Sequence, residues 1–586
     1  DKMAVNIVGV SGIIMFYVII LVIGLYAARK RNLSRRKLSI NGNPEDQPEK
    51  NETSEVILAG RNIGIIIGSF TMTATWVGGG YINGTSEVVN KRGLAWAQSS
   101  WGYSLSLLIG GFLFAKIMRQ RGYVTMLDPF QVRYGSRIGG LMYFPAFLGE
   151  LLWSAATLNS LGATISVVLS LDINVSVIVS ACIAIFYTFF GGLWSVAYTD
   201  VAQLVCMFIG MWITIPFALT HKSVKSISLT TDHWAEGWVW SEAGIWIDYA
   251  LLLICGGIPW QVYFQRVLSS KSEKQAQYLS FAAAAGCLLM SIPSILIGAV
   301  ASSTDWKKTG YKEVATIRND VLEFEYQKTM PLVLQYLTPP AISFIGLGAV
   351  SAAVMSSVDS SVLSASSMFA HNIYKMFLRP QARDKEMVWV IRVSILVIGI
   401  IATVIGLTVK SIYGLSILCS DLIYVVLFPQ LVCVLYFRYA NSYGALASFF
   451  VGMILRCLGG EDMLGMSAVI KYPYFDNANN IQKFPFRTFS MLVSTFVLLT
   501  TSIIVHLLFE KKIVPLKYDY AGFFASPIKP FCINDMIVTS GVEVSNSNKK
   551  FEDMKNEETE LIHCANEEND IDQKLEKNRK CNEVNS

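Results

Sequence analysis

Long apolar runs recur from the N-terminus to about residue 510, and they limit what this chain can fold into. Each run has about 20 residues, enough for a helix to cross ~30 Å of hydrocarbon. The runs are continuous rather than alternating, so they predict membrane helices and not a barrel. We expect an all-α integral membrane protein with about thirteen transmembrane helices, at residues 8–28, 62–84, 94–117, 138–168, 173–191, 197–220, 244–267, 275–301, 330–370, 387–408, 412–437, 442–458 and 489–510.

The composition agrees with a membrane protein and excludes other classes. Of the 586 residues, 53% are hydrophobic and 16% are charged. Soluble domains carry about 25% charged residues, so this chain could not cover the surfaces of several soluble globules. The net charge of +5 is small for a nucleic-acid binder. The enzyme motifs H-E-x-x-H, Walker A and G-x-S-x-G are absent from the sequence, and we expect no enzyme.

Basic residues predict the orientation. A cluster at 29–37 follows the first run and should be cytoplasmic, which places the N-terminus outside. An odd number of spans then places the C-terminus in the cytoplasm. Asn174 begins an Asn-Val-Ser sequon in a short outer loop and is a candidate for glycosylation. After about residue 540 the chain is polar and poor in aromatic residues, which is typical of a disordered extension.

Two runs contain helix-breaking residues near their middle. Glycine weakens a helix, and proline removes a backbone donor. Paired breaks in corresponding spans indicate a transporter's binding site at the middle of the membrane. The alternative is close helix packing, for which small residues are also used. The residues at these breaks are Gly78, Gly79, Gly80, Gly256, Gly257 and Pro259.

Asp359 is a carboxylate at membrane depth, in a stretch rich in serine. A charge there is costly unless it faces a cavity or a cation. On a helix, Ser356, Asp359 and Ser360 share a face, which favours a site for an alkali cation over a structural hydrogen-bond network. Glu150 and Asp248 lie closer to expected span ends, and structural or interfacial roles are favoured for them.

Large aromatic residues accompany the two breaks. Trp76 precedes the glycine triplet, Trp260 follows Pro259, and Tyr103 and Trp153 lie in neighbouring spans. Aromatic faces attract a quaternary ammonium ion, which cannot donate N–H hydrogen bonds. A single tryptophan is more often a packing residue, so the breaks are what favour a binding role.

The chain resembles the sodium:solute symporter family, and within it the branch that carries choline. The resemblance covers roughly residues 8–510 and is carried by the segments 70–85, 122–130, 256–270 and 346–357. It implies a LeuT-type core of five plus five inverted helices. The implied divisions are a leading helix and cytoplasmic loop (1–61), the core (62–437), two trailing helices (438–515) and a cytoplasmic tail (516–586).

The resemblance also implies sodium-driven, chloride-dependent choline uptake by alternating access, without a cofactor. The implied location is the presynaptic plasma membrane, with synaptic vesicles as a second compartment, and the choline would supply acetylcholine synthesis. Partners would be choline, sodium, chloride and lipid, with homo-oligomers and tail-binding trafficking proteins left open. A symporter of this fold for a sugar, proline or another organic cation is the alternative. A channel would need a continuous polar pore.

The resemblance implies two sets of site residues. Sodium would be held by backbone carbonyls of the first core helix and by small residues of the eighth, with Asp359 adding negative charge. The trimethylammonium group would lie in an aromatic cage. The implied sodium residues are Thr73, Trp76, Ala353, Ser356, Ser357 and Asp359, and the implied cage is Trp76, Tyr103, Trp153 and Trp260.

Overall fold

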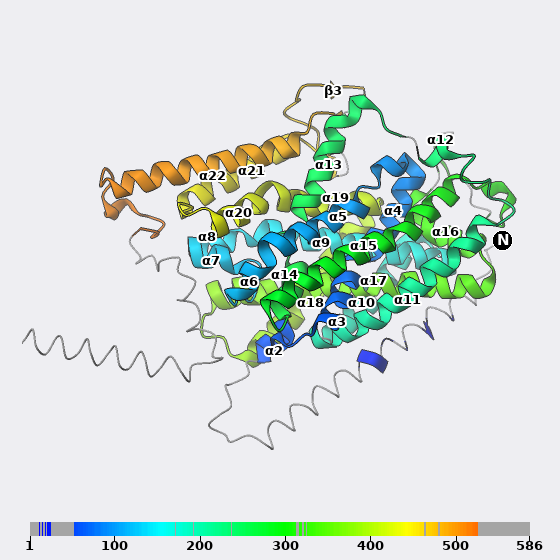
Figure 1. Cartoon of the computed structure of the whole chain (residues 1–586), viewed down its shortest axis with the longest axis horizontal. Helices are drawn as coiled ribbons and strands as arrows, with labels where there is room; N and C mark the ends of the chain where they lie inside the picture. The colour runs from blue at the N-terminus through cyan, green and yellow to red at the C-terminus, as the bar shows by residue number, and fades with distance from the viewer. Residues whose placement is uncertain are drawn as a thin grey trace, which may run out of the picture. The chain divides into compact units, whose positions relative to one another are not determined.

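The computed structural model describes scattered residues between 11 and 24 and then most of residues 52–524. The gaps in that range are residues 170, 191, 192, 236, 312–315, 319, 320, 324, 462, 463, 479 and 480. The described residues from 52 to 524 belong to one compact unit, shown in Figure 1. The first expected span, the basic cluster at 29–37 and the tail beyond residue 524 fall wholly or largely outside the described residues.

Helices dominate the described residues. The first half holds α2 (Glu52–Leu58), α3 (Ile65–Trp76), α4 (Gly79–Arg92), α5 (Ser99–Ile109), η4 (Gly110–Ala115), α6 (Lys116–Gln120), α7 (Asp128–Tyr134), α8 (Ser136–Leu141), α9 (Tyr143–Leu169), α10 (Ile173–Phe190), α11 (Leu193–Leu219), α12 (Thr231–Trp234), α13 (Ala243–Gly256), α14 (Gln261–Ser269) and α15 (Glu273–Ser302). The second half holds α16 (Thr329–Tyr336), α17 (Pro340–Met368), η8 (Phe369–Leu378), α18 (Asp384–Thr408), α19 (Ile412–Leu422), η9 (Ile423–Leu427), α20 (Phe428–Tyr436), α21 (Ser442–Leu458) and α22 (Phe486–Glu510).

Twelve of the thirteen expected spans coincide with helices in the described residues, and the first, 8–28, falls largely outside them. Nine helices there are long and apolar enough to cross a membrane, and the bent pair α3 and α4 makes a tenth. The shorter apolar helices Ile173–Phe186 and Ser442–Leu458 coincide with two further expected runs. Two small antiparallel hairpins lie between helices: β1 (Thr316–Arg318) with β2 (Val321–Glu323), and β3 (Phe475–Asp476) with β4 (Ile481–Gln482).

Polar residues mark where several helices begin. Ser272 before α15, Ser411 before α19 and Asn441 before α21 each accept a hydrogen bond from a backbone N–H of the first turn. These caps satisfy donors that would otherwise have no partner at a helix end. The apolar runs therefore make the helices, and the caps fix where three of them start.

The first break separates α3 from α4, which are bent by 45° to each other. Gly78 lies between them in an extended conformation, with φ −96° and ψ −172°. A Cβ atom at Gly78 would lie 1.5 Å from the Ser357 hydroxyl of α17. Only glycine therefore allows this close approach between the break and α17.

The second break separates α13 from α14. The helix ends at Gly256, and Trp260 is extended, with φ −115° and ψ 132°, before α14 begins at Gln261. Pro259 lies within the break and cannot donate to a helix. Both breaks predicted from the sequence are present.

The helix α17 lies inside the bundle and packs against α9, α11 and α3. Its residues from Gly346 to Met368 are all buried, and many are Gly, Ala or Ser. Small residues let helices approach closely, and hydroxyl groups can hydrogen-bond across them. This helix therefore presents oxygen atoms to the first break from close range.

Candidate functional site

Four aromatic rings meet at the two breaks. Trp76 ends α3, Tyr103 lies on α5, Trp153 on α9, and Trp260 lies between α13 and α14. All four side chains are buried, and in five of the six ring pairs the centroids lie 4.9 to 6.2 Å apart. The structure therefore brings together the four residues named for the cage, as one cluster of directly contacting rings. We call it the aromatic cluster.

The aromatic cluster is tied to the core by few polar contacts. The Tyr103 hydroxyl donates a hydrogen bond to the Ser416 carbonyl oxygen at 3.0 Å. The indole Nε1 atoms of Trp76 and Trp260 have no hydrogen-bond partner among the described residues. Gly80 packs closely on this cluster, since a Cβ there would lie 3.0 Å from the Ser416 hydroxyl and 3.4 Å from the Trp153 indole.

A second group of polar atoms faces the first break from α17. The Ser357 hydroxyl donates to the Thr75 carbonyl oxygen at 3.0 Å, and the hydroxyls of Thr75 and Ser360 lie 3.2 Å apart. A Cβ at Gly78 would lie 3.7 Å from the Ala353 carbonyl oxygen. Hydroxyl and carbonyl oxygens are the hard ligands that alkali cations prefer. The first break and α17 carry four of the residues named for sodium. Trp76 ends α3 at the break, and Ala353, Ser356 and Ser357 lie on the part of α17 that packs near it.

Asp200 of α11 is a polar residue of this region that the sequence reasoning missed. Its carboxylate accepts hydrogen bonds from the hydroxyls of Ser356, at 2.5 Å, and Thr71. It also forms a fully buried ion pair with Arg266 at 3.7 Å. A charged residue within the apolar run 197–220 was the available signal.

Asp359 and Thr73 have other neighbours. Asp359 accepts a hydrogen bond from the Thr188 hydroxyl of α10 at 2.7 Å, and its second carboxylate oxygen has no partner in the described part of the chain. The Thr73 carbonyl accepts the Val77 N–H at 2.8 Å at the end of α3. Asp359 thus faces α10, whereas Ser356 faces α11.

The segment 122–130 anchors a loop to η8, which continues the long helix α17. Asp128 accepts hydrogen bonds from the Val124 N–H at 2.7 Å and from Asn372 at 2.9 Å. Its carboxylate lies 3.5 Å from His371. Burial alone would raise the pKa of Asp128, but His371 and the hydrogen bonds lower it to about 2. This loop therefore stays attached to η8.

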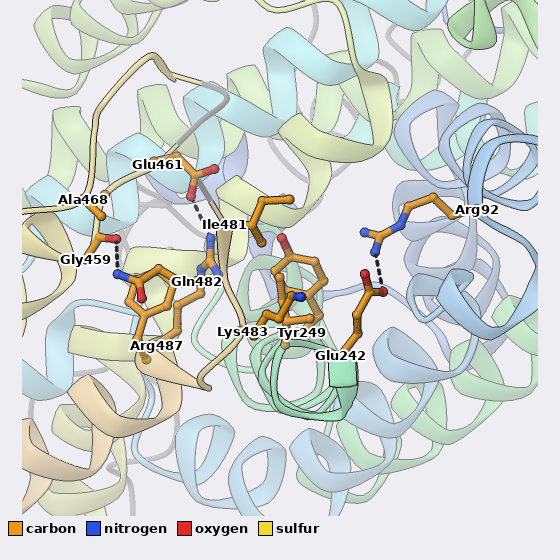
Figure 2. A pocket seen from close by; sticks show the side chains of 13 residues that line it. Arg92, Glu242, Tyr249, Gly459, Glu461, Ala468, Ile481, Gln482, Lys483 and Arg487 are labelled. Carbon is orange, nitrogen blue, oxygen red and sulfur yellow. Dashed lines mark hydrogen bonds and ion pairs between the residues drawn. The ribbon is translucent and has the colours of Figure 1, made fainter. Parts of the chain in front are cut away.

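A cavity of about 200 Å³ lies elsewhere, beside the loop between α21 and α22. Figure 2 shows Arg92 and Glu242 paired at 3.3 Å at one side of it, with Tyr249 and Lys483 next to Glu242. No residue of the aromatic cluster lines this cavity. It is therefore separate from the proposed substrate site.

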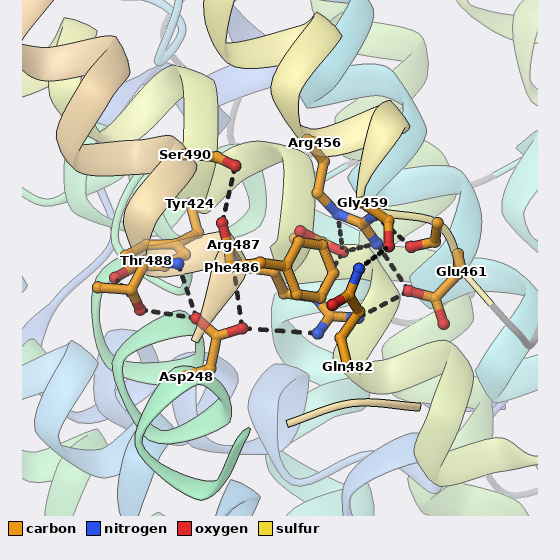
Figure 3. A network of polar contacts seen from close by, with 12 residues as sticks. Asp248, Tyr424, Arg456, Gly459, Glu461, Gln482, Phe486, Arg487, Thr488 and Ser490 are labelled. Atoms are coloured by element: carbon orange, nitrogen blue, oxygen red, sulfur yellow. Dashed lines mark hydrogen bonds and ion pairs between the residues drawn. The ribbon is translucent and has the colours of Figure 1, made fainter. Parts of the chain in front are cut away.

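A buried ionic network lies next to that cavity (Figure 3). Arg456 and Arg487 both donate to one oxygen of Asp421, at 2.7 and 3.1 Å, and to one oxygen of Glu461, at 2.6 and 2.7 Å. Asp248 of α13 accepts from the backbone N–H of Thr488 at 2.7 Å and of Arg487 at 3.2 Å. We call these residues the ionic network; it joins α13, α19, α21 and α22.

Comparisons with known proteins agree with this architecture. The profile of the sodium:solute symporter family matches residues 56–452. The high-affinity choline transporter 1 of Drosophila melanogaster is 52% identical over 517 residues, covering 88% of this chain and 81% of that protein. The high affinity choline transporter 1 of Homo sapiens is 52% identical over 529 residues, covering 88% of each. A Na+-coupled sialic acid symporter, solved in its substrate-bound outward-open state, aligns with a TM-score of 0.66 and 16% identity, covering 85% of this chain and 97% of that one.

A multi-span bundle with two broken helices, one of them facing a hydroxyl-rich helix, defines a secondary transporter. The chain belongs to the sodium:solute symporter family. The expected all-helical, multi-pass membrane fold of the LeuT type is confirmed by this membership and by the likeness to the sialic acid symporter.

Proposed function

We propose that this protein is a sodium-coupled transporter of choline and not an enzyme. Two findings support the proposal: its relatives named as choline transporters are 52% identical over 88% of the chain, and four buried aromatic rings meet at its two helix breaks. The aromatic cluster is the observation that carries the choice of substrate, because aromatic faces suit a quaternary ammonium ion.

In this proposal the trimethylammonium group of choline lies between Trp76, Tyr103, Trp153 and Trp260. Centroid distances near 5 Å are those of rings in direct contact. The rings must therefore separate to admit the cation. Because Trp76 and Trp260 stand at the breaks, a small rotation of either half-helix moves a ring without unfolding a helix.

Sodium binds, in the same proposal, between the first break and α17. Its ligands are the hydroxyls of Ser356 and Ser357, the carbonyl of Ala353 and the carbonyls near Thr73 and Trp76. The negative charge of Asp359 makes the electrostatic potential at the sodium site more favourable for a cation. Bound sodium holds α3 and α17 together, which positions Trp76 for choline. Each ligand favours the same arrangement, so each raises the affinity for the other.

The wider setting is also proposed from the resemblance. The protein resides in the plasma membrane of the presynaptic terminal, and in synaptic vesicles, with its N-terminus outside and its C-terminus in the cytoplasm. Uptake requires chloride, proceeds by alternating access and supplies acetylcholine synthesis. Asn174, which is exposed at the start of α10, carries a glycan. Homo-oligomers and trafficking proteins that bind the tail remain candidate partners.

Radiolabelled choline uptake into cells that express the chain tests the proposal. Uptake should saturate and should fall to background when sodium is replaced, and it should fall when chloride is replaced. Uninjected or untransfected cells give the background. Absence of sodium-dependent choline uptake, from protein present at the surface, contradicts the proposal.

Another small solute is the second candidate. A sugar or proline would need hydrogen-bonding groups around it, whereas the cluster offers mainly apolar ring faces. We therefore expect unlabelled solutes to inhibit the uptake of labelled choline to different degrees. The solutes to compare are choline, tetramethylammonium, glucose and proline. Choline should compete best, tetramethylammonium less well, and glucose and proline should not compete.

A further inference from the structure

Glu150 is a buried carboxylate beside the aromatic cluster. The sequence indicated a structural or interfacial role, but its side chain has no exposed surface. It lies on α9 one helical turn before Trp153, so the two share a face. Its Oε1 atom accepts a hydrogen bond from the Val262 N–H at 3.2 Å, two residues after Trp260. Glu150 thus lies between the segments that carry two of the four rings.

The other carboxylate oxygen of Glu150 has no donor. Oε2 is buried and lacks a hydrogen-bond partner within the described residues. Arg266 is the basic residue that interacts electrostatically with Glu150, but its guanidinium donates to Ser360 at 2.5 Å and pairs with Asp200 at 3.7 Å. A carboxylate oxygen is an acceptor only, and burying one without a donor is costly. An oxygen of this kind indicates a ligand that brings a donor.

Choline brings one donor. Its hydroxyl group lies two carbons from the nitrogen, so it is close to whatever holds the trimethylammonium group. The ring faces of the cluster cannot accept a strong hydrogen bond from it. The Tyr103 hydroxyl donates to the Ser416 carbonyl, and its oxygen lies 3.3 Å from the Ser420 hydroxyl, which can donate to it. The indole N–H groups of Trp76 and Trp260 are donors only. Glu150 supplies the acceptor that the rings lack.

We propose that Glu150 accepts the hydroxyl hydrogen of choline through Oε2 and thereby selects hydroxyl-bearing quaternary ammonium ions over those without a hydroxyl. The inference rests on the proposed function, since it takes the aromatic cluster as the substrate site. The positive charge of bound choline favours the ionised form of Glu150, which burial alone disfavours, and an O–H···O⁻ hydrogen bond is roughly twice as strong as a neutral one. A site built around a substrate hydroxyl also rejects the analogue that lacks it, because the buried acceptor is then unpaired.

The first test uses the unaltered protein and measures how well three unlabelled compounds inhibit the uptake of labelled choline. They are choline itself, ethyltrimethylammonium and the methyl ether of choline. Ethyltrimethylammonium lacks the hydroxyl, and the methyl ether of choline keeps the oxygen but lacks the donor hydrogen. Both should inhibit at least about 10-fold less well than choline, the low end for a charge-assisted hydrogen bond. Equal inhibition by all three would overturn the role of Glu150 and leave choline transport intact. Absence of choline uptake in the unaltered protein would instead refute the proposed function.

The second test compares the ratio of inhibition constants for ethyltrimethylammonium and choline among variants. Glu150→Leu removes the acceptor, so the ratio should fall about 10-fold or more towards 1. Glu150→Gln keeps the shape and a weaker neutral acceptor, so the ratio should fall by a smaller factor, and it carries the test if the leucine variant does not reach the surface. A purely structural Glu150 would weaken both ligands equally and leave the ratio unchanged, which would overturn the proposal.

Glu87→Gln is the matched control. Glu87 of α4 is also a buried carboxylate, but both of its oxygens have donors: the Ser411 hydroxyl at 2.6 Å and the Ile412 N–H at 3.0 Å. Its loss should lower transport without changing the ratio. If Glu150→Gln instead shifts only the sodium concentration for half-maximal uptake, Oε2 of Glu150 interacts with sodium and not with choline, and the proposal is wrong.

Discussion

The rings of the aromatic cluster are held to different degrees. Tyr103 is tied through its hydroxyl to Ser416 at 3.0 Å, whereas the indoles of Trp76 and Trp260 make no hydrogen bond within the described residues. Packing alone orients the two tryptophans. In the proposed substrate site, Tyr103 is therefore the ring whose position is fixed by a hydrogen bond, and Trp76 and Trp260 are the rings that we expect to move.

Trp260→Ala should raise the choline concentration for half-maximal uptake by about 10-fold or more. A cation–π contact that is shielded from water contributes about 2 kcal/mol, and tryptophan gives the strongest such contact. Trp260→Phe should cause a smaller increase. Concentration dependence of labelled uptake, normalised to surface protein, measures both. The control is Trp389→Ala, an exposed residue of α18, and the same increase there would contradict the assignment.

Ser357→Ala should raise the sodium concentration for half-maximal uptake by roughly 10-fold. The substitution removes a proposed ligand and the hydrogen bond to the Thr75 carbonyl, a loss of about 1–1.5 kcal/mol. Sodium titration of choline uptake gives the value. Ser366→Ala on the same helix is the control, because that hydroxyl only donates to the Val362 carbonyl at 2.7 Å. An unaltered sodium dependence in Ser357→Ala would argue against this ion site.

Prediction from sequence succeeded where the residue type alone carries the signal. Tryptophans beside glycines and proline predicted that Trp76 and Trp260 lie at the two breaks, and the structure places them there; the binding role of the cluster stays a prediction. Asp200 was missed, and Glu150 was placed near a span end. The depth of both residues in the membrane depends on helix bounds that apolar runs do not define. The partner of Asp359 could not be predicted either, because Thr188 lies 171 residues away on α10.

At the scale of elements, the two breaks are held by neighbouring helices and not by local caps. No side chain caps Gly78 at the start of α4 or Trp260 at the start of α14. Gly78 approaches Ser357 closely, and a Cβ at Gly256 would lie 2.5 Å from the Ser420 carbonyl. Sequence could predict that these helices break, but not which helices would fill the breaks.

Gly78→Ala should abolish transport. A Cβ at this position would lie 1.5 Å from the Ser357 hydroxyl, so α3 and α17 must move apart or Ser357 must leave the Thr75 carbonyl. Gly64→Ala is the matched control, because a Cβ at Gly64 meets nothing within 4 Å. Surface labelling and sodium-dependent uptake are measured for both. Normal uptake by Gly78→Ala would show that the close approach is not required.

At the scale of the whole described unit, the ionic network connects the core to the trailing helices. Asp248 and Asp421 come from the core helices α13 and α19, whereas Arg456 and Arg487 come from α21 and α22. All four side chains are buried. Removing one partner of a buried pair leaves an uncompensated charge and costs about 3–5 kcal/mol. The trailing helices therefore contribute to the stability of the core.

Arg487→Ala should lower the thermal stability of the solubilised protein strongly, because Asp421, Glu461 and Asp248 lose a shared partner. Arg487→Lys should be intermediate, since lysine cannot form the planar fork. The fraction that remains monodisperse after heating is the measurement. Arg92→Ala is the control: its pair with Glu242 is partly exposed, and such pairs contribute at most about 1 kcal/mol. Equal stability of Arg487→Ala and Arg92→Ala would refute the structural role.

Asn174→Gln should increase the electrophoretic mobility of the protein, and glycosidase treatment should give the unaltered protein the same mobility. The reason is the proposed orientation, which places the start of α10 outside the cell. Asn51→Gln is the control, because Asn51 begins a second sequon, Asn-Glu-Thr, in the loop that the same orientation places in the cytoplasm. A mobility change in the Asn51 variant and none in the Asn174 variant would reverse the orientation.

The hydrogen bond from Ser357 to the Thr75 carbonyl joins residues 282 positions apart. A ribosome adds about 5–20 residues per second, so the first core helix emerges roughly 15–55 s before its partner. During that interval no side chain of α17 can hold the bend at Gly78. We therefore expect α3 and α4 to enter the bilayer before the bend at Gly78 is fixed, and to take their final arrangement only after α17 has been made. Chains truncated before α17 should then lack the bent form of this helix.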